Sequence, residues 1–351
     1  MNLIGEHTDY SDGFCLPVAI DRECRITATP SDDGQIRATS AQLAGEAIVD
    51  AVTGTALPGS ARWGSFVAGA VATVRDRGHP IDGMRLAIDS SVPPGAGLSS
   101  SSALAVALTL LFLPVDAPER NDLRDIARLA LAAEVRATGV PGGLLDQMAS
   151  LGGREGHALL LDCRALTIDP VPLPDDLAIL VIHSGVERAL ADSAYAARRA
   201  SCEAAARRIG VDKLRDAHLN QVGDDQFARH VVTENARVLE FCAVLRAPKG
   251  DRDRRLGELL LASHASLRDD FEVSTPELDV LVEQAVAAGA IGARLTGAGF
   301  GGCIVALAPK VAAATCLDVA MTTYRAKTGR DPTGFIARAA PGANFCDQVE
   351  H

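Results

Sequence analysis

The residues best suited to chemistry begin with a glycine- and serine-rich run at 92–104, Val-Pro-Pro-Gly-Ala-Gly-Leu-Ser-Ser-Ser-Ser-Ala-Leu. Glycines let a backbone approach a ligand closely, and the serines stand where the following apolar run should begin a helix. The N-terminus of a helix has unpaired N–H groups and a partial positive charge, which suit phosphate. Hydroxyl groups there can cap the helix or join a metal ion's shell. The run therefore predicts an anion site, and the alternative is an ordinary serine-capped helix.

Ionisable side chains are crowded near the start of the chain. Glu6, His7 and Asp9 stand within four positions after a short apolar lead. This spacing predicts a polar ligand site at the end of a strand, and the alternative is a solvated loop. Further on, Asp146 lies between Leu-Leu and Gln-Met, where a carboxylate is costly to bury unless it is paired. It is either a functional acid or a helix cap.

A second glycine cluster lies near the end of the chain. Gly297, Gly299 and Gly302 spell G-x-G-x-x-G. A dinucleotide fingerprint requires a helix directly after the glycines, whereas a strand-like apolar run follows at 303–307. The cluster therefore predicts a hairpin-like turn that packs against a phosphate or against another backbone segment.

The apolar pattern predicts the elements that must position these residues. A strand at 84–88 leads into the glycine and serine run, and a helix follows it at 104–113. Strands followed by helices in the first half of the chain favour a mixed α+β domain. Further strands are expected at 14–20, 24–28, 35–40, 47–52, 157–163 and 177–183, and further helices at 63–77, 123–138 and 189–209, with helices prevailing to about 290.

Bulk composition limits the class of protein. The 351 residues suffice for two domains. A net charge of −11 argues against a nucleic-acid or anionic-membrane surface. Eight cysteines without a C-x-x-C pair or zinc spacing fit a reducing cytosol, and no signal peptide or membrane-spanning apolar run is present. We expect a cytoplasmic protein with small-molecule partners, and favour a monomer.

Three separated stretches resemble one family. Residues 2–10, Asn-Leu-Ile-Gly-Glu-His-Thr-Asp-Tyr, resemble the N-terminal signature of galactokinases. Residues 93–103 resemble the phosphate motif of the wider galactokinase, homoserine kinase, mevalonate kinase and phosphomevalonate kinase (GHMP) superfamily, and residues 292–307 resemble its C-terminal glycine motif. The first motif is specific to sugar kinases. Shorter galactokinase-like stretches lie at 143–147, 195–203, 266–274 and 276–278.

The resemblance implies ATP-dependent phosphorylation of galactose at its C1 hydroxyl, giving galactose 1-phosphate. It also implies an α+β, two-domain GHMP kinase fold with the active site between the domains. The N-terminal domain, residues 1–175, would resemble ribosomal protein S5 domain 2. Residues 176–351 would form a GHMP-type C-terminal α+β domain.

The resemblance also assigns roles to individual residues. Asp146 matches the aspartate that contacts the C1 hydroxyl, as general base or as an orienting group. Ser101 and Glu134 match the ligands of magnesium. The sugar contacts matched are Glu6, His7, Asp9, Gly143, Asp146 and Tyr195. The positions expected to wrap the triphosphate of ATP are Gly95, Ala96, Gly97, Leu98, Ser99, Ser100, Ser101 and Ser102.

Two departures from the family pattern stand out. In the phosphate motif the alanine and serine at 102 and 103 are exchanged, a small change that we expect to be tolerated. The family has Pro-Gly-Arg-Val before the first signature, and this chain has only Met1 there. The family's arginine, a partner of the catalytic aspartate, has no counterpart here. We therefore expect the natural product to be longer and this form to be a weak or inactive kinase, which an assay of both forms would test.

Two alternatives stay open at this point. The chain could phosphorylate a related sugar, such as N-acetylgalactosamine or arabinose. It could instead bind sugar and ATP as a sensor that regulates a partner. A panel of sugars separates the first alternative from galactose, and comparison of phosphate transfer with simple binding separates the second.

Overall fold

The computed structural model describes residues 1–93, 95, 97–186 and 191–345, apart from the side chains of 191–193. These residues form two compact units. The first unit consists of Met1–Asp21, Pro94–Leu98 and Arg154–Ala340, and the second of Arg22–Pro93, Ser99–Gly153 and Pro341–His351. The start of the chain thus groups with its C-terminal half, whereas the family-level boundary at residue 175 stays a prediction.

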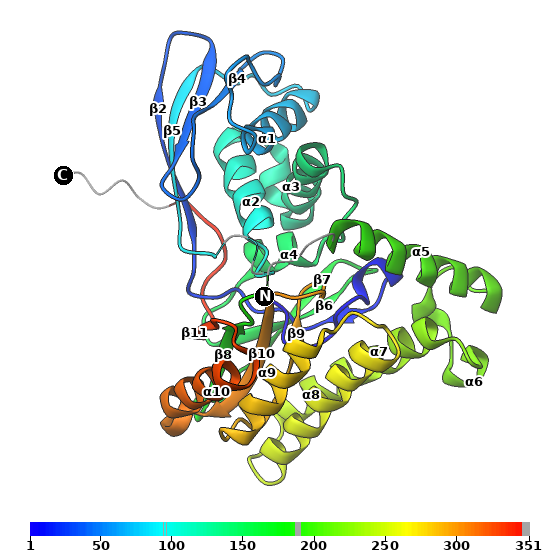
Figure 1. Ribbon diagram of the computed structural model, residues 1–351. Helices are drawn as coiled ribbons and strands as arrows, with labels where there is room; N and C mark the ends of the chain where they lie inside the picture. The colour runs from blue at the N-terminus through cyan, green and yellow to red at the C-terminus, as the bar shows by residue number, and fades with distance from the viewer. Residues whose placement is uncertain (94, 96, 187–190, 346–351) are drawn as a thin grey trace. The chain divides into compact units, whose positions relative to one another are not determined.

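The second unit is built on one four-stranded sheet with the order β2-β5-β3-β4. Strand β5 pairs with β2 antiparallel and with β3 parallel, and β3 pairs with β4 antiparallel. Helices α1, α2 and α3 lie on one side of this sheet (Figure 1). The strands are β2 Cys24–Pro30, β3 Gln35–Ser40, β4 Ala47–Asp50 and β5 Met84–Ser90, and the helices are α1 Gly64–Asp76, α2 Ser100–Phe112, the 3-10 turn η2 Pro118–Asn121, α3 Leu123–Thr138 and α4 Leu145–Gly152.

Helix α3 has clear start and stop signals. Asp122 caps it by accepting a hydrogen bond from the backbone N–H of Arg124, and Gly139 ends it in the left-handed conformation. Its apolar face packs closely on α1. The two helices approach so closely that a Cβ on Gly69 of α1 would lie 2.5 Å from the carbonyl oxygen of Ala133. This close packing fixes the position of the next residue, Glu134.

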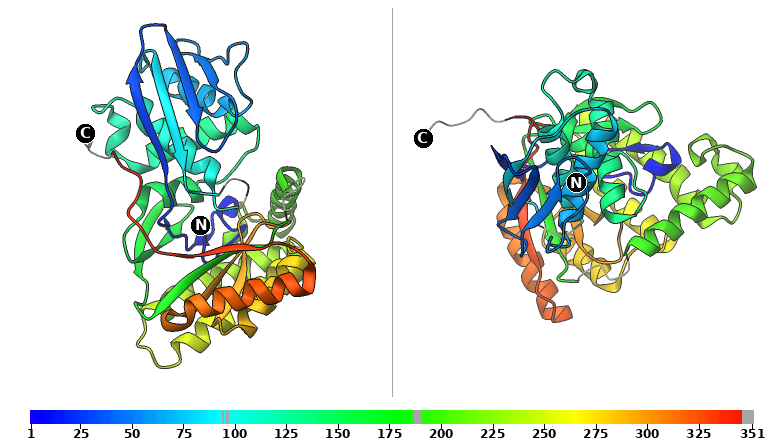
Figure 2. Two further views of the ribbon diagram at one scale, coloured as in Figure 1. Left: turned by 60° about the vertical axis from the view of Figure 1, so that its left-hand side comes forward. Right: turned by 90° about the horizontal axis from the view of Figure 1, so that it is seen from above.

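The first unit contains two antiparallel sheets with the orders β11-β8-β10-β9 and β1-β6-β7. Helices α8 and α9 pack on β9, and α10 packs on β8 and β11; Figure 2 shows α10 lying along this sheet. The strands are β1 Phe14–Cys15, β6 His157–Asp162, β7 Thr167–Pro172, β8 Leu177–His183, β9 Gly292–Thr296, β10 Cys303–Pro309 and β11 Thr333–Ala337. The helices and turns are η1 Asp9–Ser11, α5 Ala191–Ile209, η3 Leu214–Asp216, α6 Leu219–Val222, α7 Gln226–Arg246, α8 Arg252–Asp269, α9 Pro276–Ala287, η4 Lys310–Ala312 and α10 Ala313–Thr328.

Most expected elements are present, and one is much shorter than predicted. The apolar segment at 14–20 forms a strand only at Phe14–Cys15. Pro17 lacks a backbone N–H, so beyond Cys15 the chain makes isolated bridges, Asn2 with Pro17 and Ile20 with Ala339. The helix predicted from residue 189 begins, within the described residues, at Ala191. Among the described residues, no helix is long and apolar enough to cross a membrane.

Candidate active site

The segment that carries the sugar signature folds into a buried loop of the first unit. We call residues 5–13 the signature loop. Leu3 and Leu16 fix its base, since Leu3 N–H donates to the Leu16 carbonyl and Leu16 N–H donates to Ile4. Gly5 has a φ of +99°, and a Cβ there would lie 2.7 Å from the Phe14 carbonyl oxygen. The loop therefore requires glycine at its first position.

Glu6 is anchored by one of its two carboxylate oxygens. Its Oε1 accepts hydrogen bonds from Thr296 Oγ1 at 3.0 Å and from the Gly297 N–H at 2.7 Å, and Arg294 Nη1 lies 3.5 Å away. Glu6 is 6% exposed and Arg294 is fully buried. No residue that the structure describes donates a hydrogen bond to Oε2. The side chain is thus fixed in place by one oxygen, and the other receives no hydrogen bond from the described part of the chain.

His7 is buried and neutral. A carbonyl oxygen can only accept, so the contact of Nε2 with the Ala298 carbonyl, 3.2 Å, places the ring hydrogen on Nε2. Nδ1 then accepts from the Tyr10 hydroxyl at 3.0 Å. Burial, with the charge of His230 next, lowers the pKa of His7 to about 3. Both ring nitrogens are therefore bonded within the protein, and a direct contact of His7 with a sugar stays a prediction.

The first unit contains two more predicted sugar contacts, Asp9 within the signature loop and Tyr195 beside it. Asp9 is the first residue of η1. The backbone after it is held by two cations, since Lys213 Nζ donates to the Tyr10 carbonyl at 3.1 Å and Arg215 Nη1 donates to the Asp12 carbonyl at 2.9 Å. Tyr195, on α5, has its ring centroid 5.5 Å from that of His7 and 5.6 Å from that of Tyr10. Glu6, His7, Asp9 and Tyr195 therefore belong to one cluster.

Helix α7 supplies a buried polar support for the signature loop that the sequence analysis missed. Glu234, with no exposed surface, accepts from the Gly5 N–H at 3.0 Å and from Ser263 Oγ at 2.6 Å through Oε1, and from Arg237 through Oε2. His230 Nε2 donates to the Glu6 carbonyl at 3.1 Å. Burial alone would raise the pKa of Glu234, but the charges of Arg237, His230 and Arg294 lower it to about 2. The available signal was His230, Glu234 and Asn235 on a helix face whose other buried residues are apolar.

The C-terminal glycine cluster connects β9 to β10 as a hairpin and packs against other backbone. Gly297 binds Glu6 and Ala298 binds His7, as described above. Gly299 has a φ of +79°, and a Cβ there would lie 2.3 Å from the Val273 carbonyl oxygen. The sequence predicted that this turn packs against a phosphate or against another backbone segment. The structure shows the backbone contact, and the hydrogen bonds of Gly297 and Ala298 join the turn to the signature loop.

The serine run begins a helix in the second unit. Ser99, the residue before α2, has left-handed backbone angles (φ 60°, ψ 39°) and its side chain does not cap the helix. The first N–H groups of α2 therefore lack the serine cap that was the alternative to an anion site. Gly95 and Gly97 also have positive φ angles, 70° and 76°. Ala96 lies outside the described residues, and Ser100 is the first residue of α2.

Two carboxylates lie close together in the second unit. Glu134 Oε2 accepts from Ser102 Oγ at 2.9 Å and from Gln147 Nε2 at 2.6 Å. The pKa of Glu134 is raised, mainly by burial, with hydrogen bonds from Ser101 and Ser102 opposing the shift and the charge of Asp146 adding to it. Asp146 is half-buried in the first turn of α4, and Gly143, also half-buried, precedes it. The structure thus brings Ser101, Ser102, Glu134 and Asp146 together.

This donor set suits a hard divalent cation. Magnesium prefers carboxylate, hydroxyl and phosphate oxygens, and a cation would relieve the repulsion between Glu134 and Asp146. Gln147 Oε1 is buried and has no partner among the described residues, so one more oxygen acceptor lies beside Glu134. Within the part of the chain that the structure describes, no three His, Cys, Asp or Glu side chains form a ready metal site. Any magnesium here would therefore need oxygens from serine and from a ligand.

Comparison with known proteins identifies the family. Family models match residues 1–30 (galactokinase galactose-binding signature), 65–154 (GHMP kinases N terminal domain) and 246–322 (GHMP kinases C terminal). A galactokinase of Roseiflexus sp. (strain RS-1) is 42% identical over 97% of this chain and 90% of that protein. A galactokinase of Mycobacterium tuberculosis (strain ATCC 25618 / H37Rv) is 44% identical over 99% of this chain and 97% of that protein. The chain belongs to the galactokinase family.

Solved structures agree with this assignment. The galactokinase of Lactococcus lactis, in complex with galactose, is 30% identical and superposes with a TM-score of 0.88 over 97% of this chain and 92% of that chain. The mevalonate kinase of Methanococcus jannaschii, 17% identical, superposes with a TM-score of 0.65 over 97% of this chain and 95% of its own, and shares the fold. The expected α+β, two-domain GHMP kinase fold and the galactokinase resemblance are both confirmed, and the chain is a sugar kinase of the superfamily that uses ATP.

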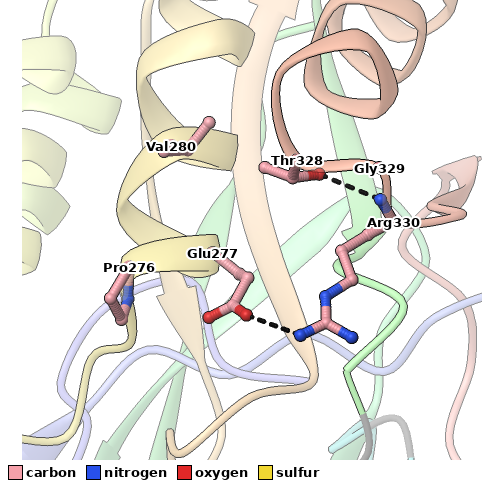
Figure 3. Close-up of a pocket in the computed structure, with 6 residues that line it drawn as sticks. All are labelled: Pro276, Glu277, Val280, Thr328, Gly329 and Arg330. Carbon is pink, nitrogen blue, oxygen red and sulfur yellow. Dashed lines mark hydrogen bonds and ion pairs between the residues drawn. The ribbon is translucent and has the colours of Figure 1, made fainter.

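This chain has a surface cavity of about 360 Å³ whose lining residues are distant in the sequence from the predicted ligand residues. It is bordered by the first turns of α9 and the end of α10, where Glu277 and Arg330 form an ion pair at 3.0 Å (Figure 3). None of its six lining residues is a predicted sugar, ATP or magnesium ligand. This cavity therefore gives no support to the predicted ligand residues, and their assignment depends on the motifs and on the hydrogen-bond geometry of Glu6.

Proposed function

We propose that the chain transfers the γ-phosphoryl group of ATP to the C1 hydroxyl of galactose, giving galactose 1-phosphate and ADP. The observation that carries this proposal is the galactose-binding signature at residues 1–30, in which Glu6 keeps one oxygen to which no described residue donates. The proposal is supported by relatives that are galactokinases at 42% and 44% identity. It is further supported by the solved relative that holds galactose.

Sugar recognition would depend on the signature loop. Glu6 Oε2 would accept a sugar hydroxyl, because Oε1 is already held by Thr296 and Gly297. Asp9 and Tyr195 would add hydrogen bonds to other hydroxyls. His7, neutral and bonded at both ring nitrogens, would hold the loop and the Tyr195 ring in place. Gly143 would leave room for the sugar close to the backbone.

Asp146 would act on the C1 hydroxyl as general base or as an orienting group. A sugar hydroxyl is a poor nucleophile unless its proton has an acceptor within hydrogen-bond reach. Phosphoryl transfer otherwise requires mainly positioning and charge neutralisation. Asp146 stands in the first turn of α4, half-buried and near Glu134, where its carboxylate can accept a hydrogen bond from a sugar hydroxyl.

ATP would bind at the start of α2. The N–H groups of its first turn would donate to phosphate oxygens, and the residues involved would be Gly95, Ala96, Gly97, Leu98, Ser99, Ser100, Ser101 and Ser102. Magnesium would be held by Ser101 and Glu134. When bound, the ion neutralises charge on the phosphate oxygens.

We also propose that this reaction takes place in the cytoplasm and that the chain acts as a monomer on small molecules alone. The seven described cysteines are free thiols, which is compatible with a reducing compartment. The net charge of −11 disfavours nucleic acid and anionic membranes as partners.

A sugar panel with ATP tests the proposal. We expect galactose-dependent release of ADP and a 1-phosphate product by ³¹P NMR, with weaker turnover of N-acetylgalactosamine and arabinose. Asp146→Asn should reduce kcat by about 100-fold or more, while Asp125→Asn, an exposed ion-paired aspartate of α3, should leave it unchanged. Preference for another sugar would remove the substrate assignment. Binding of galactose and ATP without turnover would favour the sensor.

A further inference from the structure

Two cysteine side chains meet at the base of the signature loop. Cys15 is the last residue of β1 and Cys163 follows β6, and their sulfur atoms are 3.7 Å apart. Both are free thiols. Their separation of 148 residues in the chain gives no hint of this contact, and neither residue has a role in the proposed kinase chemistry.

The strand register explains why the two side chains meet. Phe14 pairs with Asp162 and Cys15 with Leu161, so Gly13 stands opposite Cys163, as the Cys163 N–H bond to the Gly13 carbonyl at 3.0 Å also indicates. Residues two apart on a strand share one face, which places Cys15 and Cys163 on the same face as diagonal neighbours. The Gly13 position itself is closely packed, since a Cβ there would lie 2.5 Å from Asn235 Oδ1 and 2.7 Å from Thr8 Cβ.

The hydrogen bonds of Thr8 fix the orientation of the Cys15 thiol. The single hydroxyl hydrogen of Thr8 is directed at backbone carbonyls, 2.8 Å from that of Phe14 and 3.0 Å from that of Gly5. The contact of Thr8 Oγ1 with Cys15 Sγ at 3.3 Å therefore has the Cys15 S–H as donor. The sulfur lone pairs of Cys15 are then left for other neighbours, of which Cys163 Sγ is one.

The two thiols differ in their access to solvent. Cys15 has no exposed surface, and burial, together with its contact with Cys163, raises its pKa well above the usual value. Cys163 is only partly buried. An oxidant in solution therefore reaches Cys163 first, and Cys15 remains a protonated thiol next to it.

We propose that Cys15 and Cys163 form an oxidisable pair that hydrogen peroxide closes to an intramolecular disulfide. The Cys163 thiolate attacks one peroxide oxygen, the O–O bond breaks, and a sulfenic acid and hydroxide form. The Cys15 sulfur then attacks the Cys163 sulfur, the S–O bond breaks, and the departing hydroxide takes the Cys15 thiol proton as water. In sum, two thiols and one peroxide give one disulfide and two waters, and the two sulfurs supply the two electrons.

This order of events suits a buried second thiol. Because the leaving hydroxide accepts its proton, Cys15 does not have to ionise in advance. Closing the bond removes the Cys15 S–H and with it the hydrogen bond to Thr8, whose hydroxyl lies near the carbonyls of Gly5, at the start of the signature loop, and of Phe14, just after its end. A small dithiol reverses the reaction by thiol–disulfide exchange.

Mass spectrometry of the full chain tests the pairing independently of kinase activity. Reduced protein is treated with hydrogen peroxide, alkylated and digested without reductant. We expect a cross-linked peptide containing Cys15 and Cys163 that dithiothreitol removes, and that is lost in Cys15→Ala and Cys163→Ser. Cys242→Ser, a buried cysteine of α7, is the matched control and should retain the cross-link.

A sulfenic-acid trap tests the order of the steps. With dimedone present during oxidation, wild-type protein should carry little label on Cys163, because Cys15 removes the sulfenic acid. Cys15→Ala should carry about tenfold more label at Cys163. If oxidised wild-type protein shows no cross-link, or if Cys163 proceeds to sulfinic acid at the same rate with and without Cys15, the proposal is wrong.

Discussion

Arg294 and Glu6 form a buried ion pair that holds the signature loop against β9. Arg294 has no exposed surface, and its Nε and Nη2 have no partner among the described residues. Its Nη1 lies 3.1 Å from the Leu3 carbonyl oxygen and 3.5 Å from Glu6 Oε1. Glu6, in contrast, keeps two further donors, from Thr296 and Gly297. The two partners therefore differ in how well each tolerates the loss of the other.

This difference predicts unequal effects on stability. Glu6→Gln removes the carboxylate bonded to the buried Arg294 and leaves Glu234, which also pairs with Arg237, as the acidic group that still feels its charge. Breaking a buried pair in this way costs about 3–5 kcal/mol of unfolding free energy. Arg294→Met leaves Glu6 with two donors and removes the two unpaired nitrogens, so we expect a smaller loss of about 1–3 kcal/mol. In the double variant no arginine remains to be stranded. Its loss should be smaller than the sum of the single losses by about 2 kcal/mol.

Urea unfolding of the four proteins measures this coupling. Far-UV circular dichroism reports on the whole chain, while the fluorescence of Trp63, the single tryptophan, reports on the second unit and should be unchanged. Arg252→Met removes another buried arginine of the first unit, which pairs with Asp176 away from the signature loop, and serves as the matched control. If the loss in the double variant equals the sum of the two single losses, the coupling energy of the ion pair is zero and the reasoning fails.

The same variants separate stability from sugar recognition. Glu6→Gln replaces one acceptor oxygen with an amide, and losing a hydrogen bond to a charged group costs about 1.5–3 kcal/mol. We therefore expect kcat/KM for galactose to fall about 10- to 100-fold, with the KM for ATP unchanged. Arg252→Met should leave both constants near those of the wild type. An equal rise in the KM for ATP would show a general loss of structure.

Three further predictions follow from the buried polar groups and the glycine turn. Burial lowers the pKa of His7 to about 3 and that of His230 to about 4, so below pH 6.5 the unfolded state binds more protons than the folded state. Urea titrations should therefore show the free energy of unfolding falling by roughly 1.4 kcal/mol per histidine per pH unit. A flat pH profile contradicts this. Glu234 has a pKa of about 2 in the folded protein, so its charge stabilises the fold above pH 4.3. Glu234→Gln should therefore lower the free energy of unfolding by about 3 kcal/mol at pH 7 and by little near pH 2. An equal loss at both pH values argues against this role of Glu234. Gly299→Ala should lower the free energy of unfolding by more than about 2 kcal/mol because its Cβ meets a carbonyl oxygen, whereas Gly329→Ala, in open space, should cost about 1 kcal/mol; similar losses would refute the steric argument.

Local patterns in the sequence were sufficient for most elements. The apolar spacing at 123–138 predicted α3 to the residue, and the apolar run at 177–183 predicted β8. The strand after the glycine cluster, now β10, distinguished a hairpin from a dinucleotide turn. Helix and strand periodicity are local properties, so a single sequence contains them.

Long-range contacts were beyond local patterns. Glu234 lies 229 residues from Gly5, and Gly297 lies 291 residues from Glu6. Nothing in the spacing of these residues indicates that they meet, because the approach depends on how α7 and the β9–β10 hairpin pack. In the second unit, the closeness of Glu134 to Asp146 was implied only by the family resemblance. The structure added Gln147 and the hydroxyl of Ser102 to that pair.

The signature loop shows why polar residues in a motif need not all touch the ligand. Buried polar groups must find partners within the protein, and this loop buries both Glu6 and His7. His7 uses both ring nitrogens on Tyr10 and Ala298, and Glu6 uses one oxygen on the glycine turn. We therefore expect motif residues to divide between those that hold the loop and those that contact the sugar. Residues outside the motif that complete the first task, Glu234 and Arg294 above all, should therefore affect sugar recognition without contacting the sugar.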